Sequence, residues 1–446
     1  MASDLLSIAA SGARAARGAL DVTAQNIANA SSDGYVRRSL RIEEVAASGG
    51  AGQIGDISLS GARIAEIRRN ADSFLQGEVR RTSGDLQRAD VELKGLRNME
   101  SALEQSGVFN SIVEFEAVLQ QLSSDPVDPS RRAAVVAEAE TLANKFNITA
   151  SGFEAVGEGL RFDAEAQVSG ANVIGSELAR VNLRLTRAGS GSSDRAALLD
   201  QRDQLLERLA GFTTVGTQFA ADGTVAVSLG TNPPRSFVQG GTAGMLASAT
   251  AADGTLSFSV DGQAMAPGSG SLAGAALALT ELASVRTRLD TIAAGIADTV
   301  NNAQAAGSAL DGSQGQPIFT GTTAGTLKVV MTSGQGLATA PAGAVGGSRD
   351  DANLSALRQS LATLDPAQQL NGVLFDVSSK VAGRNVTQSA LQTIASSARI
   401  SLEQQSGVDL DTEAANLIRF QQAFQASGRA MQTASDIFDT LLGIGR

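Results

Sequence analysis

The chain has 446 residues, with 46 acidic and 35 basic side chains and a formal net charge of −11. It contains no cysteine and no histidine, which excludes disulfides, thiol nucleophiles, a Ser-His-Asp triad and the usual zinc, iron–sulfur and haem ligands. The acidic balance gives little electrostatic drive onto phosphate backbones or anionic lipid, and 15 Phe and 1 Tyr offer few stacking platforms. We therefore expect no nucleic-acid partner and no membrane partner.

The beginning of the chain predicts a long helix with one narrow stripe of small and apolar residues, which recur in steps of three and four as on a coiled-coil seam. The stripe consists of Leu6, Ala9, Ala13, Ala16, Leu20, Thr23 and Ile27. No basic segment precedes an apolar run at the start, and no run of about 18 apolar residues occurs. We expect neither a Sec signal nor a membrane anchor.

A turn follows this helix at residues 25–35, which read Gln-Asn-Ile-Ala-Asn-Ala-Ser-Ser-Asp-Gly-Tyr. Asn, Ser, Asp and Gly favour helix ends and turns, because they tolerate left-handed backbone or hydrogen-bond to nearby backbone groups. The chain's one tyrosine comes directly after the glycine. On physical grounds alone, the segment predicts a helix stop.

Helical periodicity recurs in the middle of the chain. The helical patterns cover residues 71–122, 131–153, 162–186, 198–209, 272–305 and 386–405. Two prolines break the chain within 124–130. From 211 to 270, frequent glycines and short alternating runs flanked by Asp-Gly pairs predict a small β-rich insertion, and a second β-leaning patch surrounds 327–331.

The end of the chain predicts a second seam helix. Its large seam residues are Leu410, Leu417, Phe424, Met431 and Phe438, with Ala414, Gln421, Gly428, Ser435 and Leu442 as companions. One mostly small seam and one bulky seam suit a close-packed pair, so we infer that the two termini pack together. The alternative, in which each stripe faces its own local core, is weakened by the polar companions. Each glycine inside these helices costs roughly 1 kcal/mol relative to Ala, so we expect frayed or disordered ends before assembly.

These patterns predict a mainly α fold with a β-rich insertion. Residues 1–34 and 406–446 would form a terminal helical assembly domain in which the N- and C-terminal helices pair as a coiled coil. Residues 35–210 and 271–405 would form an elongated, discontinuous helical bundle with short β segments. Residues 211–270 would form a small outer β domain.

Motifs for chemistry have plainer explanations. The segment Gly268–Gly274 lacks phosphate-loop spacing and predicts a linker before a helix. Asp409, Asp411 and Glu413 alternate as in half of a calcium loop or a paired-carboxylate site, but acidic residues at a helix entry also complement the helix dipole. Four arginine pairs are scattered, which favours a solvated or inter-subunit surface over a nucleic-acid patch. They are Arg37-Arg38, Arg68-Arg69, Arg80-Arg81 and Arg131-Arg132.

The string from Gln25 to Tyr35 resembles the N-terminal signature of the flagellar rod, hook and hook-associated axial proteins. That family usually has Thr-Pro-Gly-Tyr at the turn, whereas this chain has Ser32-Asp33-Gly34-Tyr35, which keeps the turn but removes the proline constraint. The run 406–442 and the segments 198–209 and 270–274 are similar to those of hook-associated members that join hook to filament. The likeness spans essentially the whole chain.

The resemblance implies a structural axial subunit with no enzymatic activity and no catalytic, cofactor or metal site. It also implies export in an unfolded state to the flagellum outside the cell, between hook and filament. The implied partners are copies of the chain in a ring, the hook protein, the next junction protein toward the filament, an export chaperone and the export apparatus. The expected assembly interface is Leu6, Ala9, Ala13, Ala16, Leu20, Ile27, Asn26, Asn29, Gly34, Tyr35, Leu410, Leu417, Phe424, Met431, Phe438 and Leu442.

Alternative hypotheses remain. A hook or distal-rod subunit would share the start of the chain but lack the 198–209 signature and this C-terminal run. A secreted hydrolase of another class would use Asp409 and Asp411 as its acids. An adhesin would act through residues 211–270, whose sequence offers no recognisable pocket for or against that role.

Overall fold

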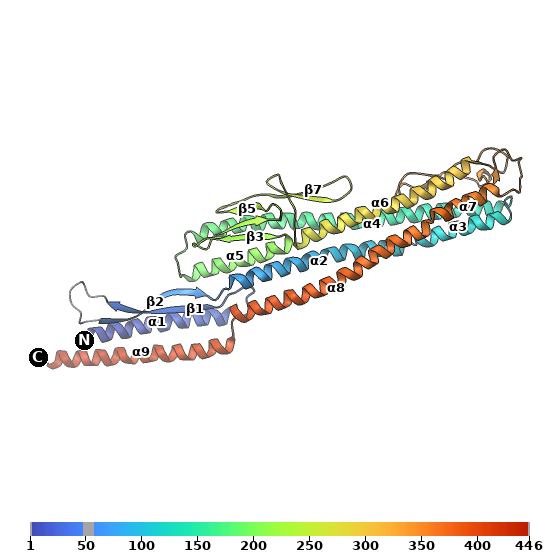
Figure 1. The fold of residues 1–446 in the computed structure, drawn as a ribbon. Coiled ribbons are helices and arrows are strands. Elements are labelled where there is room, and N and C mark those ends of the chain that lie inside the picture. Colours follow the sequence, from blue (N-terminus) through green and yellow to red (C-terminus); the bar gives the residue numbers. More distant parts are fainter. Residues whose placement is uncertain (1, 48–57, 445–446) are drawn as a thin grey trace. The chain divides into compact units, whose positions relative to one another are not determined.

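The computed structural model describes residues 2–47 and 58–444, and its side chains are described at 5–44 and 61–440 (Figure 1). The helices are α1 (Ala2–Ala28), α2 (Ser73–Ser106), α3 (Val108–Ser124), α4 (Pro129–Leu185), α5 (Ser193–Phe212), α6 (Gly270–Ala305), α7 (Ala352–Leu364), α8 (Pro366–Ser406) and α9 (Leu410–Ile444). The longer strands are β1 (Arg38–Ala47), β2 (Ser58–Arg69), β3 (Val215–Phe219), β4 (Val225–Leu229), β5 (Arg235–Gln239), β7 (Leu246–Thr250) and β8 (Leu256–Val260). The shorter strands are β6 (Thr242–Ala243), β9 (Gln263–Met265), β10 (Gly307–Ser308), β11 (Phe319–Thr320), β12 (Lys328–Val329) and β13 (Ala340–Pro341). Across the described residues, no helix has the length and apolar content needed to cross a bilayer.

The chain divides into two compact units, each built from separate stretches of sequence. Unit 1 contains residues 1–84, 170–246 and 392–446, and unit 2 contains residues 85–169 and 247–391. The mainly α fold with small sheets is confirmed. The three-domain division stays a prediction.

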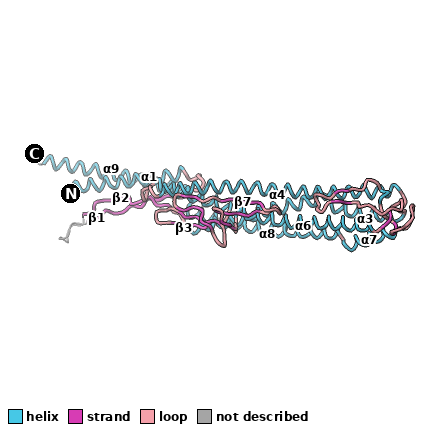
Figure 2. Tube along the Cα trace, turned by 90° about the horizontal axis from the view of Figure 1, so that it is seen from above, coloured by secondary structure: helices cyan, strands magenta, loops and turns pink. Residues whose placement is uncertain are grey.

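In unit 1 the two ends of the chain lie side by side. The first helix, α1, runs antiparallel to α9, and both views place the two termini at the same end of this pair (Figures 1 and 2). The predicted packing of the N-terminal helix against the C-terminal helix is therefore confirmed. Almost the entire chain lies between these two helices in sequence, so their contact joins the first and last segments of unit 1.

The hairpin of β1 and β2 also packs on α1, where the sequence predicted only unspecified short β segments within residues 35–210. The strands pair antiparallel, with Leu40 opposite Ile67, and a bulge follows Arg41. A Cβ at Gly18 of α1 would lie only 2.6 Å from Cδ1 of Ile64. A residue without a side chain at position 18 therefore lets the hairpin approach the helix closely.

The predicted β-rich stretch is present, with β3 to β9 lying between residues 215 and 265. In unit 1, β3, β4, β5 and β6 form an antiparallel sheet in sequence order. Asn182 of α4 donates from Nδ2 to the carbonyl oxygens of Val225 and Gly240 at 2.9 and 2.8 Å, and its Oδ1 accepts from the Val225 amide at 2.9 Å. One buried amide side chain thus fixes this sheet to the helix beneath it.

Unit 2 has one continuous hydrophobic core. Its contributors come from α2, α3, α4, α6, α7 and α8, and the rings of Phe115 and Phe319 meet edge to face at 5.8 Å between centroids. The sequence predicted one helix over 71–122, but Gly107, with φ of 70°, separates α2 from α3. It also predicted two helices over 131–153 and 162–186, which is wrong, because α4 is a single helix.

The continuity of α4 has a packing cause. Phe146, Phe153 and Leu160 recur every seventh residue and are all buried in the core. Each such side chain contributes about 1.5–3 kcal/mol on burial, which outweighs the roughly 1 kcal/mol cost of Gly157 or Gly159 inside the helix. The apolar stripe therefore carries the helix through a stretch whose local propensity is weak.

Candidate assembly interface

The α1 side of the terminal pair is built from small residues. Ala9, Ala13 and Ala16 are buried, and a Cβ at Gly12 would lie 3.1 Å from the Ser427 hydroxyl of α9. Leu20 and Ile27 are half-buried, whereas Leu6 is 45% exposed. Small side chains thus bring α1 and α9 into close contact, as the sequence predicted.

The α9 side keeps its large residues only partly covered. Leu417 and Met431 are half-buried, while Leu410, Phe424 and Phe438 are 54, 43 and 50% exposed. The more buried companion positions are Glu413, Phe420, Ser427 and Ala434. The predicted companions Ala414, Gln421 and Ser435 are exposed, so the companion register was wrong by one residue. The side chain of Leu442 lies outside the described residues.

The free end of this pair is apolar on its surface. The Gly12–Ser427 contact sets the register, so the beginning of α1 lies beside the end of α9. Exposed aliphatic and aromatic side chains at this end are Leu5, Leu6, Ile8, Ile437 and Phe438. Such a cluster of large exposed apolar groups is typical of a surface that another protein covers.

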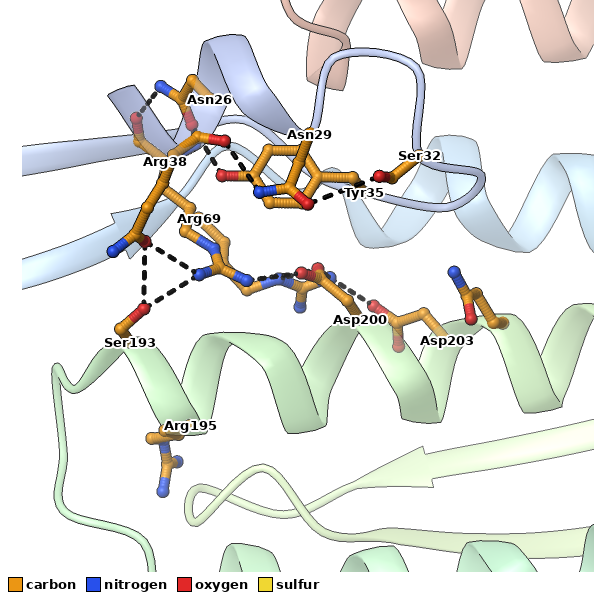
Figure 3. A network of polar contacts seen from close by, with 12 residues as sticks. Asn26, Asn29, Ser32, Tyr35, Arg38, Arg69, Ser193, Arg195, Asp200 and Asp203 are labelled. Atoms are coloured by element: carbon orange, nitrogen blue, oxygen red, sulfur yellow. Dashed lines mark hydrogen bonds and ion pairs between the residues drawn. The ribbon is translucent and has the colours of Figure 1, made fainter. Parts of the chain in front are cut away.

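The turn after α1 is held by a buried asparagine (Figure 3). Asn26, only 1% exposed, donates from Nδ2 to the Arg38 carbonyl oxygen at 2.8 Å. Its Oδ1 accepts from the Arg38 amide at 3.0 Å and from the Tyr35 hydroxyl at 2.9 Å. Asn26 therefore pairs with the first residue of β1 much as a neighbouring strand would.

The other turn residues have equally local roles. Asn29 donates to the Gln25 carbonyl oxygen at 2.8 Å and accepts from Ser32 Oγ at 3.4 Å. Gly34 has a φ of 68°, a left-handed conformation that glycine adopts without strain. Burial raises the pKa of Tyr35, against the opposing charge of Arg38, whose guanidinium lies 4.9 Å from the ring centroid. The predicted turn is present without the family's usual proline.

The 198–209 segment supplies a buried charge network to the same region, drawn in Figure 3. Asp200 of α5 accepts from Arg38 Nη2 at 3.0 Å and from Arg69 Nε at 2.8 Å, and Arg69 also pairs with Asp203 at 2.9 Å. These four side chains are each 8–10% exposed. Burial raises the pKa of Asp200, and the charges of Arg69 and Arg38 oppose that rise. The network joins the hairpin to α5.

The expected solvated or inter-subunit role of the arginine pairs is therefore wrong for several of them. Arg38 and Arg69 are buried ion-pair partners, and Arg132 in unit 2 is 1% exposed. The Arg132 guanidinium donates to the carbonyl oxygens of Gly334 and Leu337 at 3.0 and 2.9 Å. The Asp200, Gly334 and Leu337 groups that hold these arginines lie more than 100 residues from them in sequence, which is why adjacency in sequence misled the prediction.

A second link ties the turn to α9, and sequence reasoning missed it. Arg37 Nε donates to Glu413 Oε1 at 2.7 Å, and that carboxylate is 1% exposed. Asp409 accepts from the backbone amides of Asp411 and Thr412 at 2.9 and 3.0 Å, and these bonds lower its pKa. The predicted helix-entry role is confirmed for Asp409, whereas Glu413 forms a buried ion pair with Arg37.

Known proteins resemble both the ends and the middle of this chain. The family model described as the flagellar hook-associated protein FlgK helical domain matches residues 93–319. The flagella basal body rod protein model matches residues 6–35, and the model described as flagellar basal body rod FlgEFG protein C-terminal matches residues 402–444.

Two relatives that share one name cover different shares of this chain. Flagellar hook-associated protein 1 of Bacillus subtilis is 25% identical, covering 97% of this chain and 96% of that protein. Flagellar hook-associated protein 1 of Salmonella typhimurium is 28% identical over 71% of this chain, and the match spans 59% of that protein's length. The flagellar hook junction protein FlgK from Burkholderia pseudomallei aligns with a TM-score of 0.48 at 22% identity, over 54% of this chain and 46% of that one. Because the FlgK helical-domain match alone covers about half of the residues, this chain belongs to the flagellar hook-associated protein FlgK family.

Proposed function

We propose that this chain is a structural axial subunit of the bacterial flagellum that joins hook to filament, without enzymatic activity. It self-assembles through the α1–α9 pair after export, outside the cell. Its neighbours are copies of itself in a ring, the hook protein and the next junction protein toward the filament. An export chaperone and the export apparatus handle it beforehand, and neither nucleic acid nor membrane is a partner.

The observation that carries this proposal is the incomplete burial of the terminal pair. Phe424 and Phe438 remain about half exposed within one copy. Covering the rest of such a side chain contributes about 1 kcal/mol, taking half of the usual 1.5–3 kcal/mol for a fully buried residue. Every copy in a polymer repeats that contribution, so modest apolar contacts support a stable assembly.

The middle of the chain favours a hook-associated subunit over a hook or rod subunit. The rod-type matches are confined to residues 6–35 and 402–444, whereas the FlgK helical-domain match fills 93–319. The carboxylate hydrolase would use Asp409 and Asp411 as its acids. Asp409 accepts hydrogen bonds from the backbone amides of Asp411 and Thr412 at the N-terminus of α9, so it is not placed as a free general acid.

Substitution of one incompletely buried seam residue of α9 tests the proposal. Phe424→Asp or Leu417→Asp should leave a soluble, helical chain that fails to join hook to filament, because a carboxylate would have to be buried on assembly. The matched control is Phe162→Asp on α4, where the native ring is 72% exposed. Electron micrographs of a deletion strain should show hooks without filaments, with flagellin shed into the medium. Filaments attached normally in cells carrying Phe424→Asp would refute assembly through this pair.

A further inference from the structure

Unit 1 contains a hollow beneath the turn after α1. Its volume is about 710 Å³, and it is walled by the turn 30–36, the first turns of α2, one side of α5 and the segment 399–409. Its acidic lining residues are Asp33, Asp203, Glu207, Glu403 and Asp409, and its basic ones are Arg80 and Arg399. Carboxylates therefore outnumber arginines in the wall, and we call this cavity the acidic hollow.

Three of those carboxylates lie around Arg399. Arg399 lies 3.4 Å from Asp33, 3.4 Å from Glu207 and 3.3 Å from Glu403. Asp33 is 93% exposed and Glu403 is 65% exposed. Arg80 also acts on Glu207, and Asp203 is neutralised by Arg69. The wall still has two arginines for four other carboxylates, so the hollow retains negative charge that favours a further cation.

The terminal pair carries the complementary charge. Four exposed arginines on it have no carboxylate within 4.0 Å in the part of the chain that the structure describes. We call them the arginine band, and they are Arg14, Arg17, Arg419 and Arg429. The Gly12–Ser427 contact places all four within about ten residues along the pair, a length of roughly 15 Å.

We propose that the arginine band of one copy docks into the acidic hollow of the next copy, an inference that rests on the self-assembly proposed above. Arg419 cannot reach the acidic hollow of its own copy, because α9 leads away from it. From Leu410 to Arg419 the helix rises about 14 Å. The contact is heterologous, since it joins two different surfaces. Repetition of such a contact gives a ring or a helical tube instead of a closed pair.

Cross-linking tests the geometry directly, because the native chain has no cysteine. Gln422→Cys lies one turn from Arg419 on the band, and Gln404→Cys lines the hollow; both side chains are exposed. A short bis-maleimide is applied to flagella from cells in which the doubly substituted chain replaces the native one. Within one copy, the rise of α9 alone separates the two positions by about 18 Å, beyond the reach of a reagent half that long.

The expected result is a ladder of multimers from the double variant and none from either single variant. Dimers without higher species would indicate an isologous contact and overturn the proposal. Cross-links to a different protein, or no cross-link in flagella that keep their filaments, would also overturn it.

Charge reversal provides the second arm. Arg17→Glu or Glu403→Arg, added to the cross-linking chain, should each reduce the ladder at least fivefold, and the two together should restore it. Arg187→Glu, an exposed arginine of unit 1 outside the band, is the matched control and should leave the ladder unchanged. If the ladder is insensitive to both reversals while Phe424→Asp still abolishes filament attachment, the docking inference fails and the proposed function stands. If a deletion strain keeps attached filaments, the proposed function itself fails.

Discussion

Removal of Asp200 should unfold unit 1 at a much lower denaturant concentration than the native chain. Its carboxylate compensates two arginines, Arg38 and Arg69, whose side chains are each 8% exposed. In Asp200→Ala, Arg69 retains Asp203, but Arg38 retains only hydroxyl and amide acceptors on Ser193 and Gln25. Leaving a buried charge without its partner costs about 3–5 kcal/mol. With a urea m-value of about 1–3 kcal/mol/M, the midpoint should fall by roughly 1–5 M.

The assay can be local, because Tyr35 is the chain's one tyrosine, there is no tryptophan, and the ring lies beside Arg38. Tyrosine fluorescence during urea unfolding therefore reports on unit 1. The control is Asp194→Ala, an exposed acid in the first turn of the same helix, which should cost only about 0.3–1 kcal/mol through the helix dipole. Equal, small shifts for the two variants would show that solvent screens the network and that the reasoning is wrong.

Two further outcomes follow from single positions. Tyr35 should ionise above pH 10.0 in the folded chain and near 10.0 in urea, as measured by tyrosinate absorbance. Because folding raises the pKa of Tyr35, its contribution to stability is complete below pH 10 and is lost as the pH rises through the folded pKa. Ionisation of the folded chain at or below 10.0 would contradict this. Gly175→Ala should destabilise by about 1–3 kcal/mol, since its Cβ would lie 2.6 Å from the buried Phe237 ring. Gly159→Ala on the same helix, with nothing within 4 Å, should stabilise by about 0.5–1 kcal/mol, and thermal melts giving both changes the same sign would refute the packing argument.

Periodicity predicted what depends on local pattern. The seams of α1 and α9 are regular over several turns. Neither seam suits a separate local hydrophobic core, so the pairing of the two helices follows from the pattern. The turn at Gly34 was equally visible, since a left-handed residue must follow the helix stop. Asp409 at the entry to α9 was assigned its helix-entry role from charge and position alone.

Long-range polar contacts left no comparable trace in the sequence. Asp200 lies 162 residues from Arg38, and Glu413 lies 376 residues from Arg37, so no periodicity relates them. The β1–β2 hairpin was missed although Leu40 and Ile42 alternate with polar and charged residues, which is the pattern of a half-buried strand. The break over 153–162 was predicted because glycines dominate the local propensity there, while the buried stripe that overrides them is a property of the packed bundle.

The distribution of interaction types in unit 1 explains how α1 and α9 can keep an exposed assembly surface and still stay attached to the rest of the unit. Burying alanines releases little free energy, so the α1–α9 contact is weak for its length. The orientation of these helices is instead fixed by directional hydrogen bonds near the end of α1 and the beginning of α9. Asn26 bonds to the backbone of β1, and Arg37 bonds to the buried carboxylate of Glu413. Large apolar groups such as Phe438 can then remain outward, where a neighbouring copy gains by covering them. If the large apolar residues also fixed the orientation of α1 and α9, folding of one copy would bury the surface that assembly needs.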